Sequence, residues 1–127
     1  MDNAIPSANG VAIANLVRLA LLTDNLEYRD RAEKSWQAFS SVMEKTPTAC
    51  PSLFTALDWF LQGTSVKADR ESLEQLAAQY LPTTVYRRET NLLQNAIALV
   101  CQGSSCLEPA TSIEEVLEQI KSVTGRD

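Results

Sequence analysis

The chain of 127 residues contains no histidine. This absence excludes Ser-His-Asp and Cys-His catalysis, histidine-ligated zinc, and histidine as a proton carrier near neutral pH. Any proton transfer within the chain would depend on carboxylates, lysine, tyrosine or cysteine. Because no other catalytic motif is recognisable, we expect no catalytic residue, no cofactor and no metal site in these residues.

Long apolar runs and a basic excess are also missing. The most apolar stretch, residues 11–22, is too short to cross a bilayer and is interrupted by polar residues. The first residues lack the basic and then apolar segments of a secretory signal. The formal net charge is −5, and the short basic clusters are flanked by acids, whereas phosphate backbones bind sustained basic surfaces. We therefore expect a cytoplasmic protein with no nucleic-acid and no membrane partner.

Residues 6–22 predict a helix that is apolar nearly all the way round. Ser7 can cap its start, and we expect it to end near Thr23. Beyond the first turn, its strongly polar residues are Asn15 and Arg18. A helix with so narrow a polar stripe has to be surrounded by other protein, which indicates a piece of a larger helical assembly.

Two more helices follow. Residues 26–44 form an amphipathic pattern, with apolar side chains in one stripe and charges opposite. Residues 51–62 are again largely apolar, with Asp58 in a narrow polar stripe. Alternating inner and outer helices with short turns are typical of an α/α toroid or solenoid, and an ordinary helical bundle is the alternative.

The second half of the chain predicts a small sheet with helices against it. The expected elements are a strand at 64–68, a helix capped by Asp69 and stopped by Pro82, strands at 83–87 and 96–101, and a last helix opened by a capping box at 111–114 or 112–115. The fold class is therefore α+β, mainly α. We expect antiparallel helices in residues 1–63, from the end of a toroid, and a β-α-β-β-α unit in residues 64–127.

Two motifs carry a resemblance to a known family. The first is Asp2-Asn-Ala-Ile-Pro-Ser-Ala-Asn-Gly-Val-Ala12 with Asn15-Leu-Val-Arg-Leu19, and the second is Ala98-Leu-Val-Cys-Gln-Gly-Ser-Ser-Cys106 with Pro109. In this order, they resemble the C-terminal part of the thioredoxin-domain-containing family that includes spermatogenesis-associated proteins.

The resemblance implies a longer parent protein. It would have a thioredoxin-like domain, then a six-hairpin α/α toroid similar to N-acylglucosamine 2-epimerases and six-hairpin glycosidases, and the rest of that parent chain would be the partner of this segment. The resemblance names no reaction. Ala8 stands where the family usually has glycine, and Gly10 stands where it usually has serine. A ligand held by that serine would lose the contact here.

Candidate ligand residues lie at the start of the first helix. In a toroid, Asp2, Ser7 and Asn9 would face the central cavity, where they could meet a sugar-like ligand or an anion. The alternative is plain helix capping. Asn15, Arg18 and Asp58 occupy the polar stripes of the two apolar helices, where they would line the same cavity. The alternative for Arg18 and Asp58 is a buried ion pair, since a buried arginine needs a partner.

The cysteines form the other candidate site. Cys101 and Cys106 enclose a turn that can bring them to disulfide distance, so a reversible disulfide, two free thiols and a structural role all stay open. Cys50 is expected to be packed.

Two functional classes follow from these patterns. In the first, the chain is non-catalytic by itself and contributes to a carbohydrate-like ligand cavity of an epimerase- or glycosidase-like parent. In the second, it is an interaction or scaffold domain with a redox-sensitive Cys101/Cys106 pair. A truncated toroid would also leave an apolar helix face that is either exposed or covered by a second copy, and the second case would give a homo-oligomer.

Overall fold

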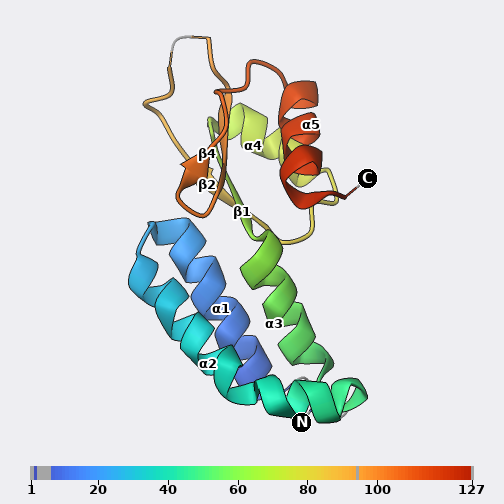
Figure 1. Ribbon diagram of the computed structural model, residues 1–127. Coiled ribbons are helices and arrows are strands. Elements are labelled where there is room, and N and C mark those ends of the chain that lie inside the picture. Colours follow the sequence, from blue (N-terminus) through green and yellow to red (C-terminus); the bar gives the residue numbers. More distant parts are fainter. Residues whose placement is uncertain (1, 3–6, 94, 127) are drawn as a thin grey trace. The chain divides into compact units, whose positions relative to one another are not determined.

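The computed structural model describes residues 2, 7–93 and 95–126, and the chain divides into two compact units, Met1–Gly63 and Thr64–Asp127 (Figure 1). The first unit contains helices α1 (Ala8–Thr23), α2 (Leu26–Lys45) and α3 (Pro51–Gln62), with a 3-10 turn at Pro47–Ala49. The second contains β1 (Thr64–Ala68), α4 (Arg70–Ala77), β2 (Thr84–Arg88), β3 (Ala98–Gln102), β4 (Ser105–Cys106) and α5 (Ile113–Thr124). The predicted α+β, mainly α class is confirmed.

Short-range capping contacts define the ends of α1 and the start of α2, and the two helices form a hairpin. The Ser7 hydroxyl accepts the Gly10 N–H at 3.2 Å and caps α1. Asp24 ends α1 in the left-handed conformation, with φ of 57°. The Asn25 side chain then accepts the Glu27 N–H at 3.0 Å and caps α2. Two residues are enough to reverse the chain, so the two helices lie antiparallel side by side (Figure 1).

Within this chain, α1 is buried on one side only, and the larger assembly expected to surround it stays a prediction. Its buried side is formed by Ile13, Ala14, Val17 and Leu21. The opposite side is exposed, with 46% of Val11, 41% of Leu19 and 40% of Leu22 accessible. Helix α1 packs against α2 and α3, and two neighbouring helices cannot cover the whole circumference of a third.

The end of α3 is held by two arginine–aromatic contacts. The Arg18 guanidinium of α1 lies 4.5 Å from the centroid of the Trp59 ring. The Arg29 guanidinium of α2 lies 4.2 Å from the centroid of the Phe60 ring and donates to the Phe60 carbonyl at 3.4 Å. Trp36 meets Phe60 edge-on, at 5.9 Å between centroids. Each cation–π contact contributes about 0.5–1 kcal/mol at a partly exposed position.

Gly10 allows the closest approach of α1 to α3. A Cβ placed on Gly10 would lie 2.3 Å from the Ser52 hydroxyl oxygen and 2.7 Å from the Ser52 carbonyl carbon. Real side chains do not tolerate such distances to backbone atoms. The missing side chain therefore sets how near the two helices can come.

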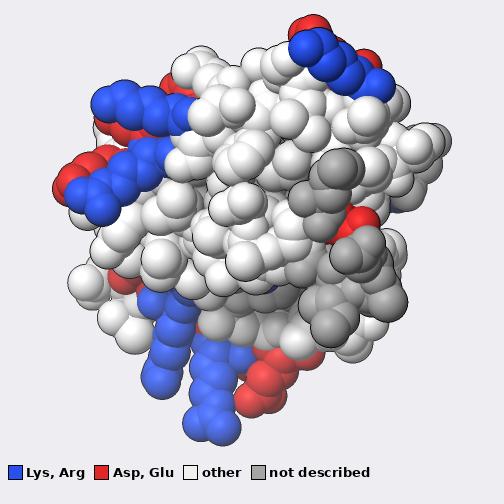
Figure 2. Space-filling view, turned by 90° about the horizontal axis from the view of Figure 1, so that it is seen from below, with Lys and Arg blue, Asp and Glu red and all other residues white. Residues whose placement is uncertain are grey.

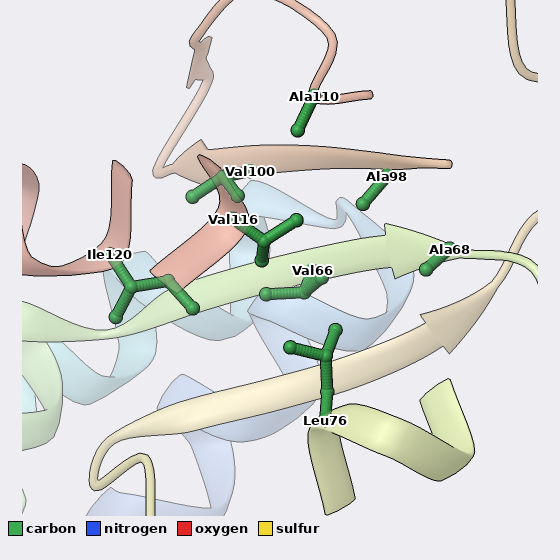
Figure 3. Packing of buried hydrophobic residues seen from close by; sticks show 8 residues of the cluster. All are labelled: Val66, Ala68, Leu76, Ala98, Val100, Ala110, Val116 and Ile120. Carbon is green, nitrogen blue, oxygen red and sulfur yellow. The ribbon is translucent and has the colours of Figure 1, made fainter. Parts of the chain in front are cut away.

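The second unit is a four-stranded sheet in the order β2-β1-β3-β4. Strands β1 and β2 pair in parallel, with α4 as the connection, and the other two pairings are antiparallel. Val66 pairs with Val100 and Ala68 with Ala98, so these four side chains share one face. Figure 3 shows that face packed against side chains of α4 and α5, which are Leu76, Val116 and Ile120.

Three details differ from the expected elements. Helix α4 ends at Ala77 rather than near Pro82, and Tyr80, which lies beyond that end, is 90% exposed. The short strand β4 was not expected. Of the two proposed capping boxes, the serine half of the later one forms: Ser112 accepts the Glu115 N–H at 3.2 Å, while the Glu115 carboxylate accepts the Thr111 N–H at 2.9 Å.

Charged side chains are unevenly spread over the surface. On the face shown in Figure 2, Lys and Arg stand in small groups beside Asp and Glu, toward the margins of a broad uncharged area. Two surface ion pairs, Arg31–Glu27 and Arg70–Glu74, join residues one helical turn apart. Within the described residues, no helix is long and apolar enough to span a membrane.

The close approach at Gly10 predicts an unusual response to alanine. Gly10→Ala is expected to lower the free energy of unfolding by about 1–3 kcal/mol through overpacking against Ser52. It should do so although alanine is the better helix former by about 1 kcal/mol. Urea unfolding measures the change.

The matched control is Ala12, which is exposed on the same helix. Ala12→Gly reports helix propensity alone and should cost about 1 kcal/mol. A rise in stability for Gly10→Ala would contradict the close approach of the two helices.

Candidate functional site

One carboxylate joins the N-terminal ends of α1 and α3. Asp2 Oδ1 accepts a hydrogen bond from the Ser7 N–H and another from the Ser52 hydroxyl, the latter at 2.5 Å. Asp2 Oδ2 accepts the Ser52 N–H at 2.6 Å. The two serine hydroxyl oxygens lie 3.1 Å apart, and the Asp2 N–H donates to the Ala49 carbonyl at 2.9 Å. The carboxylate therefore closes a small polar cluster where the two helices begin.

The electrostatics of this cluster favour the ionised carboxylate. Hydrogen bonds from the Ser52 hydroxyl and Ser52 N–H lower the pKa of Asp2 from 3.8 to about 2, with smaller help from Ser7 and partial opposition from burial. The positive ends of two helix dipoles act in the same direction. A carboxylate that stays ionised far below neutral pH is a poor general acid or base. The arrangement is that of a cap shared by two helices.

The other predicted ligand residues lie on the two helices that begin at this cluster. Asn9, Asn15 and Arg18 are exposed on α1, and Asp58 is half-buried on α3. Arg18 is exposed and lies over Trp59, so the expectation that Arg18 is buried is wrong. Ser7 and Arg18 are eleven positions apart, or about 16 Å along the helix axis. These residues therefore do not converge on one site for a small ligand within this chain.

Ser52 is the functional residue that the sequence reasoning missed. It donates to both oxygens of Asp2 and fills the space beside Gly10. A signal was present, because the dipeptide Pro-Ser precedes or opens both apolar helices, at 6–7 and at 51–52. The same dipeptide near two helix starts indicates two sets of unpaired N–H groups, which one acceptor can serve.

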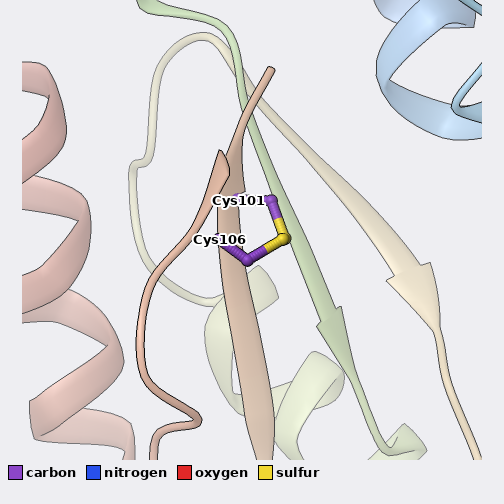
Figure 4. Close-up of a disulfide and its surroundings, with 2 residues drawn as sticks. All are labelled: Cys101 and Cys106. Atoms are coloured by element: carbon purple, nitrogen blue, oxygen red, sulfur yellow. A yellow bond between two sulfur atoms is a disulfide. The ribbon is translucent and has the colours of Figure 1, made fainter. Parts of the chain in front are cut away.

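The second candidate site is a disulfide between Cys101 of β3 and Cys106 of β4 (Figure 4). The two residues are direct partners in the antiparallel pairing, with a Cα–Cα distance of 4.0 Å. Gly103, at a φ of 62°, begins the two-residue turn that closes the hairpin. Leu107 N–H donates to the Val100 carbonyl at 2.9 Å, which makes the cysteine pair the closer, non-hydrogen-bonded type. The predicted alternative of two free thiols is not what the structure contains.

The two bonded cysteines differ in accessibility. Cys101 is 2% exposed, whereas Cys106 belongs to the exposed residues of the hairpin. The third cysteine, Cys50, is free and buried, as expected, and its thiol donates to the Thr46 carbonyl at 3.3 Å. Across residues 2, 7–93 and 95–126, no group of three or more potential ligands is placed to hold a metal ion.

The second unit also has a shallow hollow of about 360 Å³ between the end of α4 and α5. It is lined mainly by apolar side chains, among them Leu81, Leu117 and Ile120, with Lys121 and Arg126 at its polar part. None of the ligand residues expected from the sequence lines it.

Comparison with known proteins gives one partial relationship. A segment of 56 residues, or 44% of this chain, is 41% identical to spermatogenesis-associated protein 20 of Rattus norvegicus. That segment covers 7% of the length of the relative. No protein-family model and no solved structure matches the chain. The match supports the predicted relationship to spermatogenesis-associated proteins, while the thioredoxin-like domain and the toroid stay predictions.

The shared cap predicts an acid-sensitive contribution to stability. The folded-state pKa of Asp2, about 2, lies below the ordinary value of 3.8, so the ionised carboxylate stabilises the folded protein at pH values above 3.8. This contribution is lost as the pH falls from 3.8 toward 2. The difference in unfolding free energy between the native protein and Asp2→Asn should therefore be largest near neutral pH and shrink over that acid range.

The exposed Asp30 of α2 provides a control with the same change of charge. Asp30→Asn should leave a much smaller difference across the same pH series. A pH-independent effect of Asp2→Asn would mean that the carboxylate charge does not act at the helix ends.

We expect the disulfide to contribute modestly to the free energy of unfolding. Replacing both Cys101 and Cys106 by serine should lower the unfolding free energy by about 2 kcal/mol, because the bond closes a short loop. Native protein in reductant should lose a similar amount, and both samples should keep the helical circular dichroism of the oxidised form. If reductant leaves the urea midpoint of the native protein unchanged, the bond is not formed in solution.

Proposed function

We propose that this chain is a non-catalytic packing domain of a longer α/α-toroid protein, in which further helices of the same protein cover the outer face of α1. This outer face comprises Val11, Asn15, Arg18, Leu19 and Leu22. Its exposed apolar side chains are the observation that carries the proposal.

The spacing of these residues supports a helix-packing role. Positions 11, 15, 18 and 22 recur at intervals of three and four, so they lie on one side of α1. Its three large apolar side chains are each about 40–46% accessible, which leaves apolar area that further packing would remove from water. A neighbouring helix with an apolar stripe is the partner that such a face fits. The partial match to a far longer relative supports a covering segment from the same protein.

Two polar side chains on this face are candidates for ligand binding. The Asn15 amide and the Arg18 guanidinium can hydrogen-bond hydroxyl groups. Within the parent protein, they are the candidates for lining a cavity for a carbohydrate-like ligand. Asp2 and Ser7 act in this proposal as helix caps rather than as ligand residues, because their polar atoms are already engaged. The isolated chain is expected to show no epimerase or hydrolase turnover.

The disulfide favours a second candidate function, an interaction or scaffold domain with a redox-sensitive cysteine pair. The bond lies in a short hairpin with one accessible cysteine, Cys106. Such bonds persist in oxidising compartments and are reduced by cytosolic thiols. The state of this pair would therefore report the redox conditions around the domain.

The outer face of α1 predicts how the isolated chain behaves. We expect it to bind a hydrophobic dye or to self-associate at high concentration, because the face is uncovered. The double variant Leu19→Gln/Leu22→Gln should weaken both effects and lower the unfolding free energy by no more than about 2 kcal/mol, since the replaced side chains are already partly in water. Light scattering and dye fluorescence measure the change.

Leu61→Gln provides the control, because Leu61 is 61% exposed on α3 and lies outside the defined face. This variant should leave dye binding and mass unchanged. Equal effects of the control and the α1 variant would contradict a dedicated docking face, and a dimer that the α1 variant abolishes would identify a second copy as the occupant.

A further inference from the structure

We propose that Cys106 is a thiol-exchange site, at which an incoming thiolate forms a mixed disulfide while Cys101 leaves. This inference rests on the second candidate function, the redox-sensitive pair. It assigns different roles to the two sulfurs and names the class of partner, a molecule that presents an accessible thiol.

Accessibility decides which sulfur is attacked. Thiol–disulfide exchange requires the thiolate to reach one sulfur of the bond, and its rate depends on which sulfur is open to it. Cys106 is exposed in the hairpin, whereas Cys101 is 2% exposed. The same difference makes the buried Cys50, which is 1% exposed, an internal reference for an unreactive thiol.

The position of the bond in the sheet lets the reaction occur without opening the buried cluster that faces α4 and α5. Strand β4 is the outermost strand in the order β2-β1-β3-β4. The core side chains of β1 and β3 face α4 and α5. Figure 4 shows the disulfide on the side of β3 away from α5. A thiol that reaches Cys106 therefore meets the edge and the other face of the sheet.

Backbone hydrogen bonds hold the chain around the hairpin when the bond is broken. Leu107 N–H donates to the Val100 carbonyl at 2.9 Å, and Ala110 N–H donates to the Ala98 carbonyl at 2.9 Å. Ile97 N–H also donates to the Ala110 carbonyl at 2.8 Å. These bonds anchor residues 107–110 beside β3, so the segment that gains freedom is the tip around Gly103. Cys106 would carry its adduct on this tip, while Cys101 stays within β3.

The exchange balances without an external oxidant. The incoming thiolate forms a bond to the Cys106 sulfur, the Cys101–Cys106 bond breaks, and its electron pair leaves on the Cys101 sulfur, which takes a proton from water. A second thiolate can then attack the partner's sulfur in the mixed disulfide and release Cys106. In the complete cycle, two partner thiols are oxidised to a disulfide and the two cysteines of this chain are reduced.

The test traps the mixed disulfide in the folded protein. Oxidised chain is incubated with glutathione as the monothiol probe, quenched in acid, alkylated and mapped by peptide mass spectrometry. We expect glutathione on Cys106 and the alkyl group on Cys101, with Cys50 unmodified until the protein is denatured. Glutathione on Cys101, equal amounts on both, or no adduct despite an intact bond would overturn the proposal.

Single variants test the same asymmetry independently of the native bond. Cys101→Ser leaves Cys106 as a free thiol that should react with glutathione disulfide. Cys106→Ser leaves Cys101, which should react at least about tenfold more slowly because it is buried. Similar rates would overturn the assignment, and matching circular dichroism spectra show that both variants are folded.

Alkylation of the untreated protein shows whether the disulfide forms at all. It therefore tests the redox-sensitive pair separately from the assignment of Cys106 as the attacked sulfur. If Cys101 and Cys106 are both alkylated without reductant, no bond forms, and the redox-sensitive pair fails together with the inference. If the bond is present and the adduct maps elsewhere than Cys106, the pair stands and the assignment of the attacked sulfur fails.

Discussion

The close approach of α1 to α3 at Gly10 is the constraint on which the first unit depends. Because Gly10 has no side chain, the Ser52 hydroxyl can lie where a Cβ would otherwise be. This approach brings the N-terminal ends of both helices within reach of one carboxylate, that of Asp2. Farther along the same pair of helices, it allows Arg18 to lie over Trp59. The polar cluster is thus first a device for joining two helices.

In the second unit, the buried cluster and the disulfide lie on different faces of the sheet. The face toward α4 and α5 carries the buried cluster that includes Val66 and Val100. The disulfide lies on the side away from α5, at the strand that ends the sheet (Figure 4). Since neither cysteine belongs to that cluster, the bond can be made or broken without disrupting it. This separation is what makes a redox role for the cysteine pair compatible with a stable domain.

Most of the local structure was predictable because it depends on neighbours in the sequence. The starts of α1 at Ser7 and of α4 at Asp69 follow from side chains that accept nearby backbone N–H groups. The boundary of α4 was less predictable, since Tyr80 fits the helical repeat but projects into solvent. Ser52 was missed because its partners lie fifty positions away or on another helix. The exposure of Arg18 depends on how many helices surround α1. The periodicity of the sequence gives no information on that number.

The sequence by itself determined the fold class, the caps and the absence of histidine chemistry. Tertiary structure alone decided that Asp2 meets Ser52, which side of α1 stays exposed, and that one cysteine of the pair is open to solvent. The physical reason is the range of the interactions. Caps and periodicities are set within one or two turns, whereas exposure and long-range hydrogen bonds depend on which elements pack together.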